Sequence, residues 1–413
     1  MARSYLGLLM VLCSPHVWAQ AEFSGQLRAQ WTAPTTNHQG PLRQAHALYA
    51  GSVAQPSAGL TLETELRARG HGLAGVLTLQ QQWRADRPWP SSWDGQAWIN
   101  ELNFNHDGGA WQFSLGKKVV DWDVGYAFRP NDMVQHEQRQ ALVSSAATGR
   151  PLVMAEYFGA NHAWSFVWVN PTQERGTRGA QEPAVAARYY QRVGGVDWHG
   201  FARLGEHTGA SVGGAVAWVA SDALELHGSL RWSQRVDSQA QSATLSGVVA
   251  HNPWQAQSLL DVNRVLVGGT WTSESHVSLL AEAWWDGTAP SDAQWNAWGA
   301  RNQQLVGLAA QGAPVAALAG NLAWQAQAFE VSSSLRLANV FLRLSWQQGA
   351  WQPAVDWLYT PADQGQVLTA SLTWQGDRLR VQGGARFFGG PATAVLAQLP
   401  ARSTAYVQGV WTF

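Results

Sequence analysis

Hydrophobic and polar residues alternate along most of the chain. In residues 22–31, Phe23 belongs to an apolar face and Arg28 to the opposite, polar face. The same alternation runs through 58–69 and 377–388. Successive side chains of a β-strand point to opposite faces, so this pattern predicts strands with one apolar and one polar face.

The alternating segments are long for a soluble protein. Strands of a soluble β-sandwich, the competing interpretation, usually run about five or six residues. Segments of about 10–12 residues are long enough to cross a bilayer when tilted. Short connections at 70–72, 106–109, 194–195, 347–350 and 375–377 alternate with long ones at 32–57, 84–95, 122–150, 170–183, 235–260, 286–334 and 388–401.

This arrangement predicts an all-β fold, a transmembrane antiparallel up-and-down β-barrel with short periplasmic turns and long extracellular loops. We expect about 18 strands, with 16 or 20 also compatible with the pattern. An even number returns both termini to the periplasmic side. The strands are expected near 22–31, 58–69, 72–83, 96–105, 110–121, 151–158, 162–169, 184–192, 196–205, 210–219, 223–234, 261–272, 275–285, 335–346, 350–359, 366–375, 377–388 and 402–413.

The first residues have the features of an export signal. Arg3 precedes an apolar run that is too short for a membrane span, and small residues follow it. Residues 1–21 are therefore predicted to be a signal peptide, cleaved after Ala19 or Ala21. Cleavage removes the only cysteine and leaves residues 22–413 as a single barrel domain.

The last residues, STAYVQGVWTF, form one apolar face that ends in Phe413. In this respect the chain resembles bacterial outer-membrane β-barrels, whose last strand typically ends in an aromatic residue. The resemblance implies an outer-membrane location, contact with membrane lipid and lipopolysaccharide, and recognition of Phe413 by the barrel-assembly machinery.

Composition agrees with a surface that faces lipid. Only 13% of the residues are charged, about half the usual fraction, and the chain has 25 tryptophans. Tryptophan and tyrosine gather where a membrane meets water. The net charge of −1 gives no reason to expect a nucleic-acid partner.

One loop has a different period. Residues 291–312 place Trp295, Trp298 and Leu305 at helical spacing, and Ser291 is a suitable N-cap. We expect a short helix near 292–310 that caps the rim, with contact to a ligand as the alternative role.

Lumen-facing residues of a barrel determine selectivity. Twenty-five arginines and two lysines make up the 27 basic residues, and guanidinium groups bind carboxylates and phosphates in a fixed geometry. The competing interpretation is that these arginines simply neutralise lumenal carboxylates. The polar strand faces predict these lumen and selectivity residues: Arg28, Glu63, Glu65, Arg67, Arg69, Arg188, Arg192, Arg343, Asp356, Arg378, Arg380 and Arg386.

The long connection 122–150 is expected to fold into the pore and narrow it. The strand pattern stops at Asp121, and Pro130 excludes a central strand. The charged residues predicted for this constriction loop are Asp121, Asp123, Arg129, Asp132, Glu137 and Arg139.

Enzyme and cofactor signatures are weak. The sequence has no HExxH or GxSxG motif, and His136–Glu137 is explained equally well as solvated loop charge. The spacing of Asp121, Asp123 and Asp132 matches no known calcium loop. We therefore expect no enzyme activity, no metal and no cofactor.

The layout of 18 strands, the arginine-rich lumen and the strand-to-loop passage at 116–135 resemble alginate-export-type and other substrate-specific porins. The resemblance implies passage or export of a polar or anionic small solute or a polysaccharide. Two alternatives remain: a structural or assembly component of an envelope secretion machine, and a rim enzyme acting on lipid or peptide.

Overall fold

The computed structural model describes residues 21–87, 92–134, 147–170, 182–241 and 252–413. The predicted signal peptide therefore lies almost entirely outside the described residues, as do Glu137 and Arg139 of the predicted constriction loop. Within the described ranges, no helix is long and apolar enough to cross a membrane.

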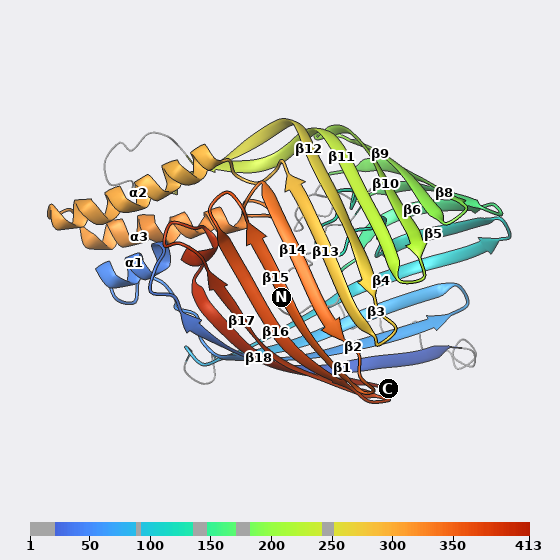
Figure 1. Cartoon of the computed structure of the whole chain (residues 1–413), viewed down its shortest axis with the longest axis horizontal. Helices are drawn as coiled ribbons and strands as arrows, with labels where there is room; N and C mark the ends of the chain where they lie inside the picture. Colours follow the sequence, from blue (N-terminus) through green and yellow to red (C-terminus); the bar gives the residue numbers. More distant parts are fainter. Residues whose placement is uncertain (1–20, 88–91, 135–146, 171–181, 242–251) are drawn as a thin grey trace, which may run out of the picture.

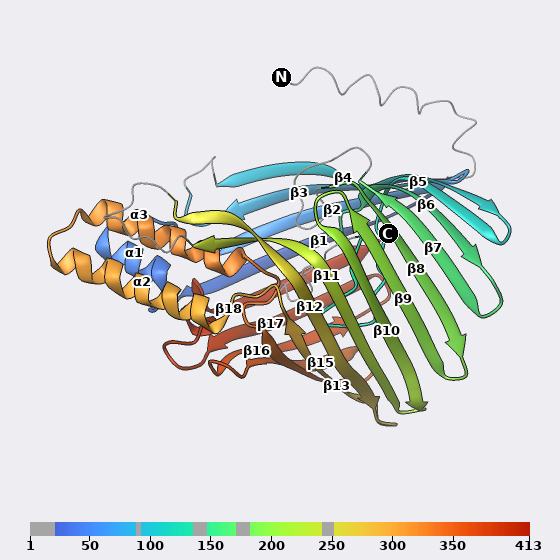
Figure 2. The same ribbon diagram turned by 90° about the horizontal axis from the view of Figure 1, so that it is seen from above.

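The chain forms one closed sheet of 18 antiparallel strands, which confirms the predicted β-barrel (Figures 1 and 2). Each strand pairs with its neighbours in the sequence, and β1 also pairs with β18 to close the barrel. The strands are β1 Glu22–Thr36, β2 Gly59–Gly70, β3 Leu73–Arg84, β4 Trp93–Gly108, β5 Trp111–Lys118, β6 Arg150–Phe158, β7 His162–Val169, β8 Ala184–Val193, β9 Val196–Gly205, β10 Gly209–Ser221, β11 Leu224–Gln241, β12 Trp254–Thr272, β13 Val277–Asp286, β14 Ala338–Trp346, β15 Trp351–Thr360, β16 Gly365–Gln375, β17 Leu379–Gly389 and β18 Ala401–Thr412.

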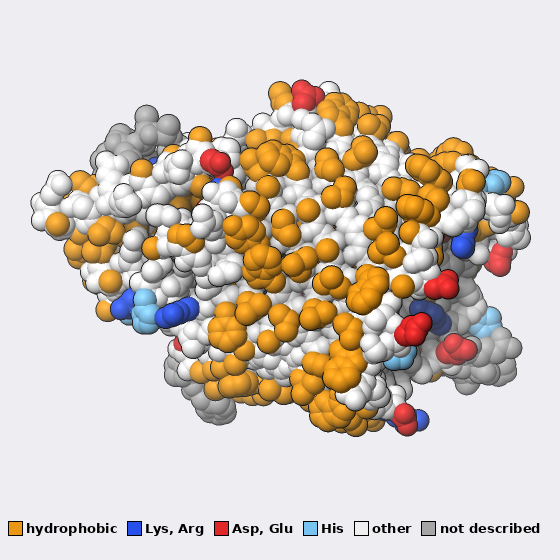
Figure 3. All heavy atoms as spheres, viewed as in Figure 1, with side chains coloured by type: hydrophobic (Ala, Val, Ile, Leu, Met, Phe, Trp, Pro, Cys, Tyr) orange, Lys and Arg blue, Asp and Glu red, His pale blue; other side chains and the backbone are white. Residues whose placement is uncertain are grey.

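The alternation in the sequence places apolar side chains on the outside of the barrel and polar side chains on the inside, the reverse of a soluble protein. In β11, Leu226 and Leu230 are exposed on the outer face, whereas His227 and Ser229 are buried on the inner face. Figure 3 shows hydrophobic side chains spread over the visible wall, with charged side chains at its margins. Polar residues lining an interior inside an apolar outer surface are what a membrane-spanning barrel requires.

The two ends of the barrel differ. We call the end with both chain termini and the short turns the turn end, and the opposite end the loop end. At the turn end, Gly25 and Phe413 exchange backbone hydrogen bonds of 2.9 and 3.0 Å. The β2–β3 turn needs two residues with positive φ, and His71 (51°) and Gly72 (79°) provide them.

The loop end has more regular structure than the sequence predicts. Helix α2 (Asp292–Ala310) lies where one helix is expected, and Ser291 forms the capping box with Gln294. Two further helices were not predicted, α1 (Pro41–Leu48) and α3 (Val315–Gln325). All three lie together at the loop end and extend away from the strands (Figure 1), with short 3-10 turns η2 (Ala326–Glu330) and η3 (Leu396–Gln398) nearby.

The predicted loop 235–260 is partly wrong. Strands β11 and β12 continue pairing as far as Gln241 and Trp254. Polar and apolar residues are mixed on both faces of this extension, so the regular alternation of a lipid-facing strand is absent although the backbone ladder continues.

The outer face gives a direct test of the barrel. Replacing Leu230, which is 58% exposed on the outer face, with arginine should place a charge in lipid. We expect Leu230→Arg to lower the free energy of unfolding by about 2–4 kcal/mol. Gln382→Arg places the same side chain on the inner face of β17 and should cost much less. Urea unfolding of protein folded into lipid vesicles measures both, and equal losses would contradict the assignment of the faces.

Candidate functional site

The chain that follows β5 turns into the barrel. Residues 119–134, the inner segment, lie against inner-wall residues of strands between β6 and β14. Val120, Trp122, Met133 and Val134 of this segment are buried in a cluster with inward-facing apolar side chains of β6–β10. The inner segment therefore lies inside the barrel, packed on its inner wall.

A buried carboxylate fixes the middle of the inner segment. Glu282 on β13 accepts hydrogen bonds from the backbone N–H groups of Tyr126 (2.6 Å) and Ala127 (2.7 Å). His227 Nε2 of β11 lies 2.9 Å from the same carboxylate, and its Nδ1 lies 3.2 Å from Glu225. Because Glu282 is buried, losing these donors would leave a desolvated charge.

Asn131 fixes the C-terminal part of the inner segment. Asn131 is fully buried, and its side-chain amide donates to Ser229 Oγ (2.8 Å) and to the Leu230 carbonyl (3.0 Å). Arg231 of β11 also reaches the Pro130 carbonyl at 3.4 Å. These bonds satisfy polar groups that the inner segment buries where no strand ladder is available.

Aromatic contacts add to this docking. Phe128 stacks on Trp284 of β13 with ring centroids 5.5 Å apart, and Tyr126 stacks on Phe341 of β14 at 6.0 Å. The guanidinium carbon of Arg343 lies 5.9 Å from the centre of the Tyr126 ring. The inner segment thus bridges wall strands that are distant in sequence.

Asp123 is a charged group inside this packing. Burial raises the pKa of its carboxyl above the ordinary value, although the Asn131 N–H (2.5 Å), the Ser229 hydroxyl (2.7 Å) and the Val124 N–H (2.9 Å) donate to it and oppose the shift. A raised carboxyl pKa means that the folded state binds its proton more tightly than the unfolded state. The corresponding stabilisation is therefore present at low pH and is lost as the pH rises through the folded pKa.

The remaining predicted loop charges are placed as follows. Asp121 is exposed and forms an ion pair with Arg129, whose Nε donates to the Gly125 carbonyl at 2.7 Å. Asp132 is buried. The constriction role of these groups stays a prediction.

Two arcs of the lumen wall carry paired charges: one on β1 and β2, and one on β14 to β17, of which β14 also contacts the inner segment. On β1 and β2, Arg28 contacts Glu63 at 2.7 Å and Arg67 contacts Glu65 at 2.5 Å. Arg67 still has 48% of its side chain exposed.

On the second arc, Arg343 of β14 donates to Asp356 of β15 at 2.9 Å, and Arg386 of β17 donates to the Thr369 hydroxyl at 3.0 Å. The register places Asp356 opposite Thr369 and Thr369 opposite Arg386, so these groups form one row across the wall.

Three predicted selectivity residues lie near the turn end. Arg378 is exposed in the turn that precedes β17, so it is not on a strand face. Arg380 is exposed on β17, with the inward parity of Arg386. Arg69 is exposed next to the last residue of β2. Arg188 and Arg192 lie on the inner face of β8.

The sequence analysis missed a buried basic cluster. Arg203 on β9 donates to Glu182 at 2.9 Å, Arg231 lies directly opposite Arg264 in the β11–β12 register, and Arg264 Nε lies 3.4 Å from Asp286. The signal was available, because positions 227, 229, 231 and 233 are polar and alternate with apolar or small residues. Glu282 was not identified, because its nearest inward neighbours on β13, Leu280 and Trp284, are apolar and hide the polar alternation.

Comparison with known proteins supports the fold. No protein-family model and no curated protein matches the chain. The crystal structure of OccAB1 from Acinetobacter baumannii is similar with a TM-score of 0.55 and 9% identity, over 95% of this chain and 96% of that chain. OccK8 (OprE) from Pseudomonas aeruginosa has a TM-score of 0.52 and 10% identity, over 95% and 98%. The chain thus shares the closed barrel fold of these two proteins.

Removing the Glu282 carboxylate should release the inner segment. Each hydrogen bond to a buried charge contributes about 1.5–3 kcal/mol, so Glu282→Ala should weaken docking by at least that amount. Hydrogen exchange at the amides of Tyr126 and Ala127 should become faster. The control Asp222→Ala removes an exposed carboxylate in the β10–β11 turn, outside the network of Glu282, and it should leave their exchange unchanged. Unchanged exchange in Glu282→Ala would contradict this docking role.

Removing the Asp123 charge should have little effect on docking, in contrast to removing the Glu282 carboxylate. Because burial disfavours its charge, Asp123→Asn keeps a hydrogen-bond acceptor and removes the desolvated charge. We expect the inner segment to remain docked, with a change in stability of less than about 1 kcal/mol. Hydrogen exchange and urea unfolding at neutral pH measure this, and a loss as large as that of Glu282→Ala would contradict it.

Proposed function

We propose that this protein is an outer-membrane channel for small polar solutes. The observation that carries the proposal is the inversion of the barrel: an apolar outer wall encloses a lumen lined with paired and partly exposed charges. Barrels of 16–18 strands leave an aqueous channel unless something fills it. With this orientation the turn end faces the periplasm and the loop end faces outward.

The inner segment favours small solutes over a polysaccharide. Its aromatic and hydrogen-bonded contacts with β11–β14 hold backbone and side chains inside the barrel. A polymer would need a continuous groove past this obstruction, whereas a small solute needs only the space that the segment leaves. Export of an anionic polysaccharide is therefore the less favoured form of the proposal.

Charge supports a moderate preference for anions. Arg67 and Arg380 are exposed, and their backbone positions place them on the inner face. Arg67 contacts Glu65 but keeps about half of its side chain exposed, whereas the paired Arg28 and Arg343 are less exposed, and this lowers their effect on a passing ion. The channel should therefore discriminate by the few guanidinium groups that remain accessible to solvent.

Planar-bilayer recording tests the proposal. The purified protein should conduct ions, and Arg67→Gln combined with Arg380→Gln should lower the ratio of anion to cation permeability roughly twofold, since a charge about 10 Å away in water contributes about 0.4 kcal/mol. Arg43→Gln on helix α1, outside the lumen, is the control and should leave the ratio unchanged.

Two outcomes would contradict the proposal. A correctly folded protein that never conducts would favour a structural or assembly component of an envelope machine. If the variant with both arginine substitutions conducts with an unchanged ratio of anion to cation permeability, Arg67 and Arg380 do not lie in the ion path.

A further inference from the structure

The inner face of β7 forms the floor of a trough near the turn end. The register places Phe158 of β6 opposite Ala163 of β7, and Ala163 opposite Tyr190 of β8. The next row places Glu156 opposite Ser165 and Ser165 opposite Arg188. The small side chains of Ala163 and Ser165, in the middle of the two rows, leave space between the larger side chains of β6 and β8.

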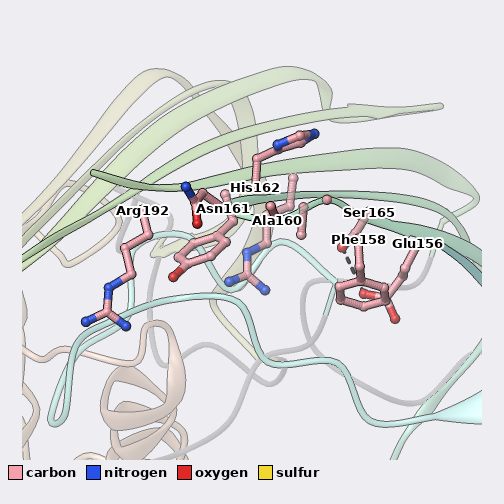
Figure 4. Close-up of a pocket in the computed structure, with 11 residues that line it drawn as sticks. Glu156, Phe158, Ala160, Asn161, His162, Ser165 and Arg192 are labelled. Atoms are coloured by element: carbon pink, nitrogen blue, oxygen red, sulfur yellow. Dashed lines mark hydrogen bonds between the residues drawn. The ribbon is translucent and has the colours of Figure 1, made fainter. Parts of the chain in front are cut away.

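This space is a pocket of about 450 Å³. Neighbouring strands lie about 4.8 Å apart, so the two walls are separated by roughly 10 Å, enough for a ring lying on the floor. In Figure 4, Glu156, Phe158 and Arg192 extend to one side of the strands, and His162 extends to the other. Small-molecule sites typically have volumes of this size.

The two walls carry opposite charges that do not form an ion pair. Glu156 accepts from the Ser165 hydroxyl at 2.9 Å, and Arg188 Nη2 lies 3.3 Å from His199 Nδ1. Within the described part of the chain, Glu156 and Arg188 make no direct contact, and Arg188 Nε has no hydrogen-bond partner although it is buried. A buried donor without an acceptor is uncommon and indicates a place for one.

Strand β8 adds a second cation and an aromatic ring. Arg188, Tyr190 and Arg192 follow one another at every second position on the inner face. The Tyr190 hydroxyl donates to Asp197 at 2.8 Å, which fixes the ring, and the Arg188 guanidinium carbon lies 5.8 Å from the centre of that ring. Arg192 is 61% exposed and 3.9 Å from Asp197, so it remains accessible.

We propose that this trough binds a small zwitterion with an apolar ring, of the aromatic α-amino acid class. The carboxylate would bind Arg188 and Arg192, the ammonium group would bind Glu156, and the ring would lie over Ala163 between Phe158 and Tyr190. A simple anion fits less well because Glu156 faces it from the opposite wall. The proposal rests on the proposed channel only for the route by which the ligand arrives.

The trough lies on the turn-end side of the inner segment. Trp122 of that segment stacks on Phe201 with centroids 6.4 Å apart, and Phe201 pairs with Arg188 in the β8–β9 register. A ligand in the trough would therefore lie next to the inner segment, on its turn-end side, in a separate site.

Calorimetry on the whole protein in detergent tests this site without requiring conductance. The probes are L-phenylalanine, 3-phenylpropanoate, which lacks the ammonium group, and 2-phenylethylamine, which lacks the carboxylate. L-phenylalanine should bind at least about tenfold more tightly than either analogue, because each loses a hydrogen-bonded charge. Equal affinity for L-phenylalanine and 3-phenylpropanoate, or no binding of L-phenylalanine, would overturn the proposal.

Substitutions locate the binding. Glu156→Gln should weaken L-phenylalanine about tenfold and strengthen 3-phenylpropanoate, because it removes the carboxylate that faces a simple anion, whereas Asp377→Asn, in the exposed β16–β17 turn, should change neither. Ala163→Leu fills the floor and should weaken L-phenylalanine binding, whereas Ala155→Leu makes the same change on the outer face of β6 and should not. Binding that is insensitive to Glu156→Gln or to Ala163→Leu would place the ligand elsewhere. Binding by a protein that never conducts would refute the channel and leave the trough intact.

Discussion

The hydrogen bonds between β1 and β18 are the interaction on which the rest of the structure depends. In lipid, every backbone N–H and C=O group needs a partner within the protein, so an open sheet edge cannot be tolerated. The first strand pairs with β2 on one side and with β18 on the other, from Gln26 to Thr36. Closure removes both edges at once. It also encloses the inward-facing side chains, and this separates a polar interior from an apolar exterior.

An enclosed polar interior makes the docking of the inner segment possible. A loop without secondary structure buries backbone groups that need partners. The wall provides Glu282 for the backbone N–H groups of Tyr126 and Ala127, and Ser229 and the Leu230 carbonyl accept from the side-chain amide of Asn131. The same wall leaves other inward groups, such as Arg188, without a complete set of partners among the described residues. The docking of the inner segment and the buried Arg188 Nε without a partner in the described chain both follow from lining a closed barrel with polar side chains.

Much of the fold could be predicted from the sequence, since alternation and turn residues are local properties. The number of strands and their direction follow from the alternation of short and long connections. Prediction failed where the local signal weakens. The ends of β11 and β12 mix polar and apolar residues on both faces, and helix α3 has a nearly uniform apolar sequence without a clear stripe. Packing of α3 against α1, which buries Ala45 and Leu318, decides that structure.

The site could be predicted only in outline. From the sequence alone, the polar faces of the strands and the existence of a break after the fifth strand were determined, because they depend on neighbouring residues; the break itself follows Lys118 and not Asp121. Which groups meet was decided by the tertiary structure. Glu282 lies 156 residues from Tyr126, and the contact follows from how the inner segment packs. The register that aligns Glu156, Ser165 and Arg188 likewise depends on pairing between whole strands, which sequence alternation leaves open.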